Sequence, residues 1–132
     1  MAHIGSWEWD VEEDKFTMSD EWLRMHGVTK KNLTMDELLP IAHPDDAKAI
    51  QKNFKEALDG LRTYELTHRF IRQDTGEVRF VNSKGIVSLD KQGKLYKVLG
   101  TVQDITEPKL IEKELEEHRD NLETLVKIVL MT

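Results

Sequence analysis

The sequence predicts an α+β domain, in which short helices cover one face of an antiparallel sheet, followed by a separate charged helix. Three observations predict it. Residues 62–106 form three segments in which apolar and polar residues alternate, with turn residues between them. Residues 4–18 contain two more such segments. Residues 45–59 and 107–130 have apolar residues at helical spacing instead.

The second half of the domain is predicted to be a meander of strands at residues 62–72, 78–87 and 95–103. Residues 73–77 and 90–94 supply the turns, because Asp closes local side-chain turns and Gly accepts a positive φ. Gly85 interrupts the middle strand, and we expect a bulge there.

The first half begins with a strand over residues 4–11, which carries Trp7, Trp9 and Val11 on one face. Residues 15–18 are expected to pair with it as a hairpin. Ser19 or Asp20 can then cap a helix that ends at Gly27, since their side chains offer an oxygen to a free backbone N–H.

Two further helical segments are predicted before the meander. Thr34 and Glu37 have the spacing of a capping box and indicate one helical turn that stops before Pro40. Residues 45–59 form the longest helix of the domain, with Ile50 and Phe54 in its apolar stripe and Gly60 after its end.

Composition narrows the class of protein. The chain has 132 residues, a formal net charge of −6 and no cysteine. Disulfides, thiolate metal sites and cysteine nucleophiles are therefore excluded, and nothing forms the basic surface that nucleic acids require. No apolar run approaches the ~20 residues of a membrane span, and the start lacks the regions of a signal peptide. We expect a cytoplasmic chain without direct membrane insertion, although its parent protein can be membrane-anchored.

Five short motifs, in this order along the chain, resemble the landmarks of the PAS family in its bacterial sensory-box branch. The last three resemble the family's C-terminal PAC motif. The motifs are Gly5-Ser6-Trp7-Glu8-Trp9-Asp10, Ala42-His43-Pro44-Asp45-Asp46, His68-Arg69, Asp74-Thr75-Gly76-Glu77 with Gly93-Lys94, and Gly100-Thr101-Val102-Gln103-Asp104-Ile105-Thr106-Glu107. The resemblance implies a PAS fold over residues 1–106, with a five-stranded antiparallel sheet in the spatial order 2-1-5-4-3 and helices around a central pocket.

The pocket that the resemblance implies would be lined by side chains chosen from strand parity and helix stripes. They are Trp9, Trp22, Met25, His26, Phe54, Phe70, Phe80 and Val102. The alternative is that these residues form an ordinary core.

The cofactor is not identified by the sequence. His26 or His68 could ligate haem, but haem-binding members of the resembled family place the histidine on or near the long helix, where residues 45–60 have none. A flavin that forms a cysteinyl adduct is excluded, whereas a non-covalently bound flavin is not.

No catalytic residues or metal ligands are predicted. His43, Asp45 and Asp46 could suggest a metal or an acid–base pair, but the two carboxylates fall at the start of a helix, where they accept free N–H groups. His43 would then orient the loop by hydrogen bonding. The sequence contains no hydrolase or nucleotide-binding motif, so we expect no enzyme activity within this chain.

Asp104, Ile105 and Thr106 join the last strand to the C-terminal helix. Asp104 can end the strand and pair with Arg79 or Arg69, and Thr106 can cap the helix. In the family that the motifs resemble, this triplet is the hinge that relays changes in the sheet to an output helix.

Residues 107–132 are predicted to form an amphipathic linker helix. Its apolar seam has heptad spacing and would pair two chains into a homodimer. The seam consists of Ile111, Leu115, His118, Leu122, Leu125 and Val129. The alternative is a helix that folds back on its own domain.

The resemblance therefore implies a non-catalytic sensory domain of a bacterial signalling protein. It would sense a small ligand or a partner and relay the change to an effector such as a histidine kinase or a diguanylate cyclase. A ligand-free dimerisation and protein-interaction module is the alternative, and a small enzyme is a third reading. The pocket's state, the ligand and the effector are not determined by the sequence.

Overall fold

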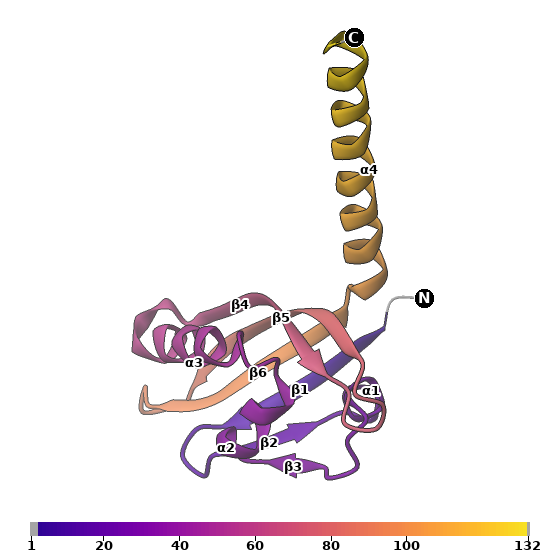
Figure 1. Ribbon diagram of the computed structural model, residues 1–132. Coiled ribbons are helices and arrows are strands. Elements are labelled where there is room, and N and C mark those ends of the chain that lie inside the picture. The colour runs from indigo at the N-terminus through magenta and orange to yellow at the C-terminus, as the bar shows by residue number, and fades with distance from the viewer. Residues whose placement is uncertain (1–2, 132) are drawn as a thin grey trace.

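The computed structural model describes residues 3–131 and contains one antiparallel sheet (Figure 1). The strand order is β3-β2-β1-β6-β5-β4. The strands are β1 (Ile4–Asp10), β2 (Lys15–Met18), β3 (Asn32–Leu33), β4 (Thr63–Ile71), β5 (Val78–Leu89) and β6 (Leu95–Asp104). The five expected strands occupy the expected order 2-1-5-4-3. The two-residue β3 is an addition at the edge, too short to leave a periodic signal in the sequence.

The short helices lie over one face of the sheet, and the C-terminal helix extends away from it (Figure 1). The helical elements are α1 (Asp20–His26), α2 (Met35–Leu38), η1 (Leu39–Ile41), α3 (Ala47–Glu56), η2 (Ala57–Leu61) and α4 (Thr106–Met131). The expected segments 1–106 and 107–132 include residues 1, 2 and 132, which lie outside the described residues.

The predicted caps of α1 and α2 are confirmed. Ser19 accepts a hydrogen bond from the backbone N–H of Trp22, and Gly27 ends α1 in the left-handed conformation with a φ of 66°. Thr34 and Glu37 form the reciprocal capping box at the start of α2. These ends depend on neighbours in the sequence, which explains why the sequence predicts them.

The predicted start of the long helix is wrong. The helix α3 begins at Ala47, and Asp46 makes no side-chain cap. Its carboxylate instead accepts hydrogen bonds from the backbone N–H of Arg69 at 2.7 Å and from the guanidinium Nε at 3.1 Å and Nη2 at 2.9 Å. A charge-assisted, forked contact of this kind outcompetes a cap. It fastens the start of α3 to β4.

The centre of the core is the indole of Trp7, which lies across two glycines. Trp7 on β1 pairs with Gly100 on β6, Gly100 pairs with Gly85 on β5, and Gly85 pairs with Tyr64 on β4. A Cβ atom on Gly100 would overlap the indole, and one on Gly85 would come within 2.9 Å of its Cη2. The glycines therefore supply the space that the tryptophan fills.

The bulge expected at Gly85 is absent, because this residue stays in regular register between Tyr64 and Gly100. The register of β5 and β6 shifts near Ser88 and Leu89 instead. Gly85 is needed for the close approach of a side chain and not for a backbone irregularity.

We predict that replacing these glycines by alanine destabilises the domain in a graded way. Gly100→Ala is expected to lower the free energy of unfolding by about 1–3 kcal/mol or more, because its Cβ would meet both the indole and the carbonyl oxygen of Lys84. Gly85→Ala should cost less. Gly60→Ala is the control, since nothing lies within 4 Å of its Cβ. Urea unfolding measures all three, and equal effects at Gly100 and Gly60 would contradict this view of the core.

Candidate functional site

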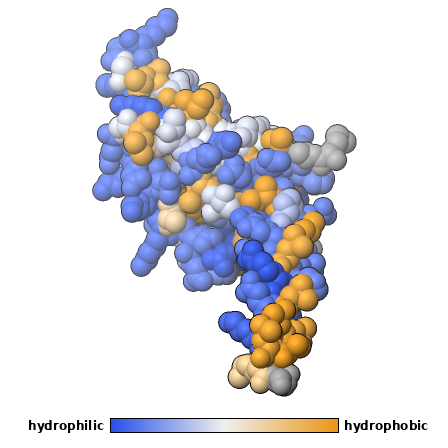
Figure 2. Space-filling view, turned by 90° about the horizontal axis from the view of Figure 1, so that it is seen from above, coloured by the Kyte–Doolittle hydropathy of each residue, from blue (hydrophilic) through white to orange (hydrophobic). Residues whose placement is uncertain are grey.

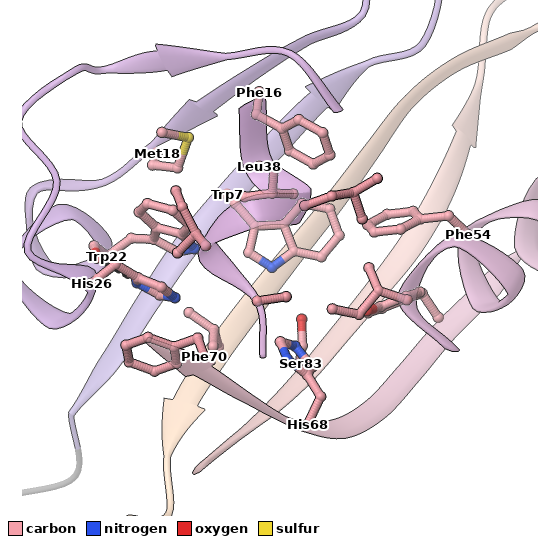
Figure 3. Close-up of a pocket in the computed structure, with 16 residues that line it drawn as sticks. Trp7, Phe16, Met18, Trp22, His26, Leu38, Phe54, His68, Phe70 and Ser83 are labelled. Carbon is pink, nitrogen blue, oxygen red and sulfur yellow. Dashed lines mark hydrogen bonds between the residues drawn. The ribbon is translucent and has the colours of Figure 1, made fainter. Parts of the chain in front are cut away.

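A small cavity lies between the inner face of the sheet and the helices (Figure 3). Its free volume is about 50 Å³. Its lining is aromatic and aliphatic apart from a few polar side chains. The lining residues are Trp7, Phe16, Met18, Trp22, His26, Leu38, Leu39, Ile41, Ala42, Ile50, Phe54, Tyr64, His68, Phe70, Ser83 and Val102.

Five of the eight predicted pocket residues line this cavity: Trp22, His26, Phe54, Phe70 and Val102. They come from α1, α3, β4 and β6. These five residues lie on the helices and on the strands of the meander.

The other three predicted residues lie elsewhere. Trp9 is buried on the inner face but stacks on Phe16, with ring centroids 5.2 Å apart. Met25 is buried in α1 without reaching the cavity. Phe80 alternates with the inward-facing Val81 and so has the opposite parity, because side chains of successive strand residues point to opposite faces. Assigning Phe80 to the pocket was an error of one residue in parity.

Several lining residues were missed by the sequence reasoning. Tyr64 and Trp7 lie on the inward-facing sides of their strands, so the alternation of residues along each strand could have identified them. The sequence does not identify Ser83 as a lining residue, because a serine on a strand is expected to face the solvent unless its neighbours in the fold are known. Leu38 is the last residue of α2 and Ile41 is the last residue of η1, and both elements are too short to show a helical periodicity.

His26 forms one end of the cavity, between two aromatic rings (Figure 3). Its ring stacks on Trp22 at 3.7 Å between centroids and lies 4.1 Å from Phe70. Nδ1 donates a hydrogen bond to the carbonyl oxygen of Trp22 at 2.7 Å. Burial lowers the pKa of His26 to about 4, so the imidazole is neutral at neutral pH.

The remaining polar groups of the cavity are also uncharged at neutral pH. Burial lowers the pKa of His68, whose Nδ1 contacts the carbonyl oxygen of Arg69 at 3.3 Å. Burial raises the pKa of the Tyr64 hydroxyl, and the neighbouring Ser83 hydroxyl offsets part of that rise. The cavity is thus an apolar space with a few neutral polar groups on its wall.

A second cluster of polar groups joins the sheet to α4. The Asp104 side chain is 8% exposed and accepts a hydrogen bond from Nε of Arg79 at 2.6 Å. Its other oxygen accepts from the backbone N–H of Thr106 at 2.9 Å and from the Thr106 hydroxyl at 2.6 Å. Burial acts to raise the pKa of Asp104, but these hydrogen bonds outweigh it and hold the pKa below its ordinary value.

Of the two arginines that the sequence offered to Asp104, the structure selects Arg79. Arg69 is held by Asp46 instead. The choice depends on register: Asp104 lies opposite Val81 on the neighbouring strand, and Arg79 is two residues further along on the same face.

Thr106 does not cap α4 in the predicted way. It is the first residue of the helix, and its hydroxyl accepts a hydrogen bond from the backbone N–H of Phe80 at 2.9 Å. The N–H of Ile105 donates to the carbonyl oxygen of Phe80, also at 2.9 Å. The free N–H at the start of the helix is bound by Asp104. The junction therefore ties β5, β6 and α4 together.

His43 has the role expected of it. Its Nδ1 accepts a hydrogen bond from the backbone N–H of Asp45 at 3.1 Å, and the backbone N–H of His43 donates to the carbonyl oxygen of Arg69 at 3.0 Å. It orients the loop before α3. Within residues 3–131, no group of three or more His, Asp or Glu side chains is placed to hold a metal ion.

The predicted seam residues of α4 are exposed, and Figure 2 shows apolar side chains gathered along this helix. The exposed fraction of the apolar seam residues ranges from 49% at Leu122 to 70% at Val129. Every residue from 110 to 131, His118 included, is exposed. The helix therefore does not fold back on its own domain.

The geometry and the comparisons with known proteins agree on the family. The family model described as the PAS fold matches residues 15–102. The chain belongs to the PAS family. Among curated proteins, hybrid signal transduction histidine kinase I of Dictyostelium discoideum is 27% identical over 128 residues. The match covers 95% of this chain but 7% of that kinase.

Solved PAS structures show the same fold. A sensory box histidine kinase/response regulator from Burkholderia thailandensis aligns with a TM-score of 0.78 and 24% identity, over 93% of this chain and 92% of that one. The N-terminal domain of a diguanylate cyclase with a PAS/PAC sensor from Marinobacter aquaeolei has a TM-score of 0.73 and 15% identity, over 80% and 98%. In the described part of this PAS chain, no helix is long and apolar enough to span a membrane.

The buried His26 predicts that the domain loses stability in acid. In the unfolded chain the imidazole binds a proton as the pH falls below 6.5. In the folded protein it binds a proton only when the pH falls to about 4. The free energy of unfolding should therefore fall by about 3 kcal/mol over this window, with His68 acting in the same direction. Urea unfolding at several pH values measures the slope.

The matched variants are His26→Phe, which should flatten the slope, and His3→Phe, which removes an imidazole that is 69% exposed and should leave it unchanged. A slope that is the same in the wild type and in His26→Phe would show that His26 is not the buried neutral group described here.

Proposed function

We propose that this PAS domain is a non-catalytic sensory module, which relays a change at its cavity through the junction at Asp104, Ile105 and Thr106 to α4. The supporting observation is the hydrogen-bond network that joins β5, β6 and the start of α4. Asp104 holds both Arg79 of β5 and the first residue of α4, and Phe80 is hydrogen-bonded to Ile105 and Thr106. A movement of β5 against β6 would therefore carry the start of α4 with it.

The position of the cavity supports the same proposal. His68 lies opposite Val81, and Val81 lies opposite Asp104, so one row of the sheet runs from the wall of the cavity to the junction. The charge of Asp104 also acts on the pKa of His26. A ligand that prefers one arrangement of this end of the cavity would shift the population of junction states.

The division of the chain follows from this proposal. Residues 1–106 form the sensory domain, and residues 107–132 form a linker that leads to an effector in a cytoplasmic signalling protein. A histidine kinase or a diguanylate cyclase is the effector class that the relatives suggest, since two such kinases and one such cyclase contain domains similar to this one. The effector's chemistry would lie outside this chain.

The linker is proposed to pair with that of a second copy. Its exposed residues Ile111, Leu115, Leu122, Leu125 and Val129 keep heptad spacing, which is the pattern of a two-stranded coiled coil. His118 would lie in the same seam. Pairing would give the rotation or shift of two helices that an effector can read.

One observation favours a second candidate function, a ligand-free dimerisation and interaction module. The free volume of about 50 Å³ is well below the roughly 150 Å³ of a cavity that holds benzene, because Trp7, Phe16 and Phe54 occupy the interior. Haem and flavins are far larger than this space. Ile86 and Leu99, which pair on the outer face of the sheet and are exposed, would then contribute to a partner surface.

The relay predicts a specific effect of Asp104→Ala. With the chain fused through α4 to a histidine kinase core, we expect kinase output to become independent of the sensory domain while the domain stays folded. In the isolated chain, the amide protons of Ile105, Thr106 and Lys109 should exchange faster, since their hydrogen bonds lose support. Asp45→Ala, at an exposed carboxylate, is the control. Unchanged output and unchanged exchange would refute the relay.

The seam predicts a concentration-dependent dimer in sedimentation experiments. Leu115→Glu should shift the equilibrium at least tenfold towards monomer, because it places a charge in an apolar interface. Leu110→Glu makes the same change at an exposed position outside the seam and should have a smaller effect. If both variants dimerise like the wild type, α4 is not the contact between the chains.

A further inference from the structure

The cavity contains a hydrogen-bond acceptor that no described residue uses. Nδ1 of His26 faces a carbonyl oxygen and must carry the proton of the neutral ring. Nε2, on the other edge of the ring, therefore has a free lone pair. His26 is 4% exposed, and its ring borders the cavity between Trp22 and Phe70 (Figure 3). Every fully buried side-chain nitrogen or oxygen of the described residues has a hydrogen-bond partner, so Nε2 is accessible to a small probe and can accept from a donor that enters the cavity.

The wall of the cavity excludes charged occupants. Its lining contains no Asp, Glu, Lys or Arg. His26 and His68 are held neutral by burial, so neither supplies a positive charge at neutral pH. An anion or a cation would lose its hydration without gaining a counter-charge, which is strongly unfavourable. The charge of the occupant is thereby fixed at zero.

The free volume sets the size of the occupant. One water needs about 10–15 Å³ on this measure, so about 50 Å³ holds roughly three to five non-hydrogen atoms. The neighbouring walls are aromatic rings in close contact, with Phe54 stacked on Tyr64 at 4.3 Å and Trp7 edge-on to both rings. Growth of the cavity would require these rings to move together.

We infer that the cavity binds a small neutral molecule of about three to five non-hydrogen atoms, such as a short amide or alcohol, which donates an N–H or O–H hydrogen bond to Nε2 of His26. This inference rests on the proposed sensory function and names the class of ligand that the same cavity would take. The apolar part of the molecule would lie against Trp22 and Phe70, which border the same cavity.

Three probes of equal size test charge and hydrogen bonding separately. Acetamide is neutral and donates, acetone is neutral and cannot donate, and acetate is an anion at neutral pH. Each is titrated into the ¹⁵N-labelled chain at millimolar concentrations, and the ring nitrogens of His26 are followed by NMR. We expect acetamide to give a saturable shift of Nε2, acetone to bind about tenfold more weakly for want of the hydrogen bond, and acetate not to bind.

The variants identify the residue that accepts the bond. His26→Phe keeps an aromatic ring between Trp22 and Phe70 but lacks Nε2, so acetamide should bind it no better than acetone does. His3→Phe, at an exposed position outside the cavity, should leave acetamide binding unchanged. The comparison of the three probes on the wild-type chain stands even if His26→Phe does not fold.

Two results would overturn the inference. One is a cavity that contains only water, with no saturable shift from acetamide. The other is equal binding of acetamide, acetone and acetate, which would show contact outside the cavity. Failure here is distinguishable from failure of the proposed function, because the Asp104→Ala experiment reads the relay without any ligand. A relay that works with no acetamide binding would refute the ligand class alone.

Discussion

The structure depends on the packing of one tryptophan against two glycines. Trp7 lies across Gly100 and Gly85, and a side chain at either glycine would collide with the indole. This contact joins β1, β6 and β5, which come from opposite ends of the chain, and brings Trp7 edge-on to Tyr64 of β4. Because interiors are close-packed, the remaining aromatic residues must arrange themselves around that ring. The sheet and its core are therefore specified together.

The same packing decides where free space remains. Trp7, Phe16, Phe54 and Trp9 form a continuous aromatic cluster on the side of the sheet near β2 and α3. His26 of α1 and His68 of β4 also border the cavity. His68 lies opposite Val81, and Val81 lies opposite Asp104, so one row of the sheet connects the wall of the cavity to the junction with α4.

Sequence reasoning succeeded where the signal is local or periodic. The capping box at Thr34, the left-handed cap at Gly27 and the alternation of β4 each follow from residues a few positions apart. It failed where a residue far away in the sequence supplies the bonding partner. Asp46 bonds to Arg69, 23 residues later, instead of capping its helix, and Thr106 at the start of α4 bonds to Phe80 of β5. Phe80 was misplaced because a shift of one residue reverses the face of a strand.

The sequence by itself determined the order and type of the main elements, the family that the motifs resemble and the heptad spacing of apolar residues in the last helix. These follow from short-range periodicity, capping and turn chemistry. Only the tertiary structure decided which arginine holds Asp104, how little of the interior is empty and which ring nitrogen of His26 bonds to the backbone. Each of those depends on atoms brought together by strand register and side-chain packing, which no stretch of sequence contains.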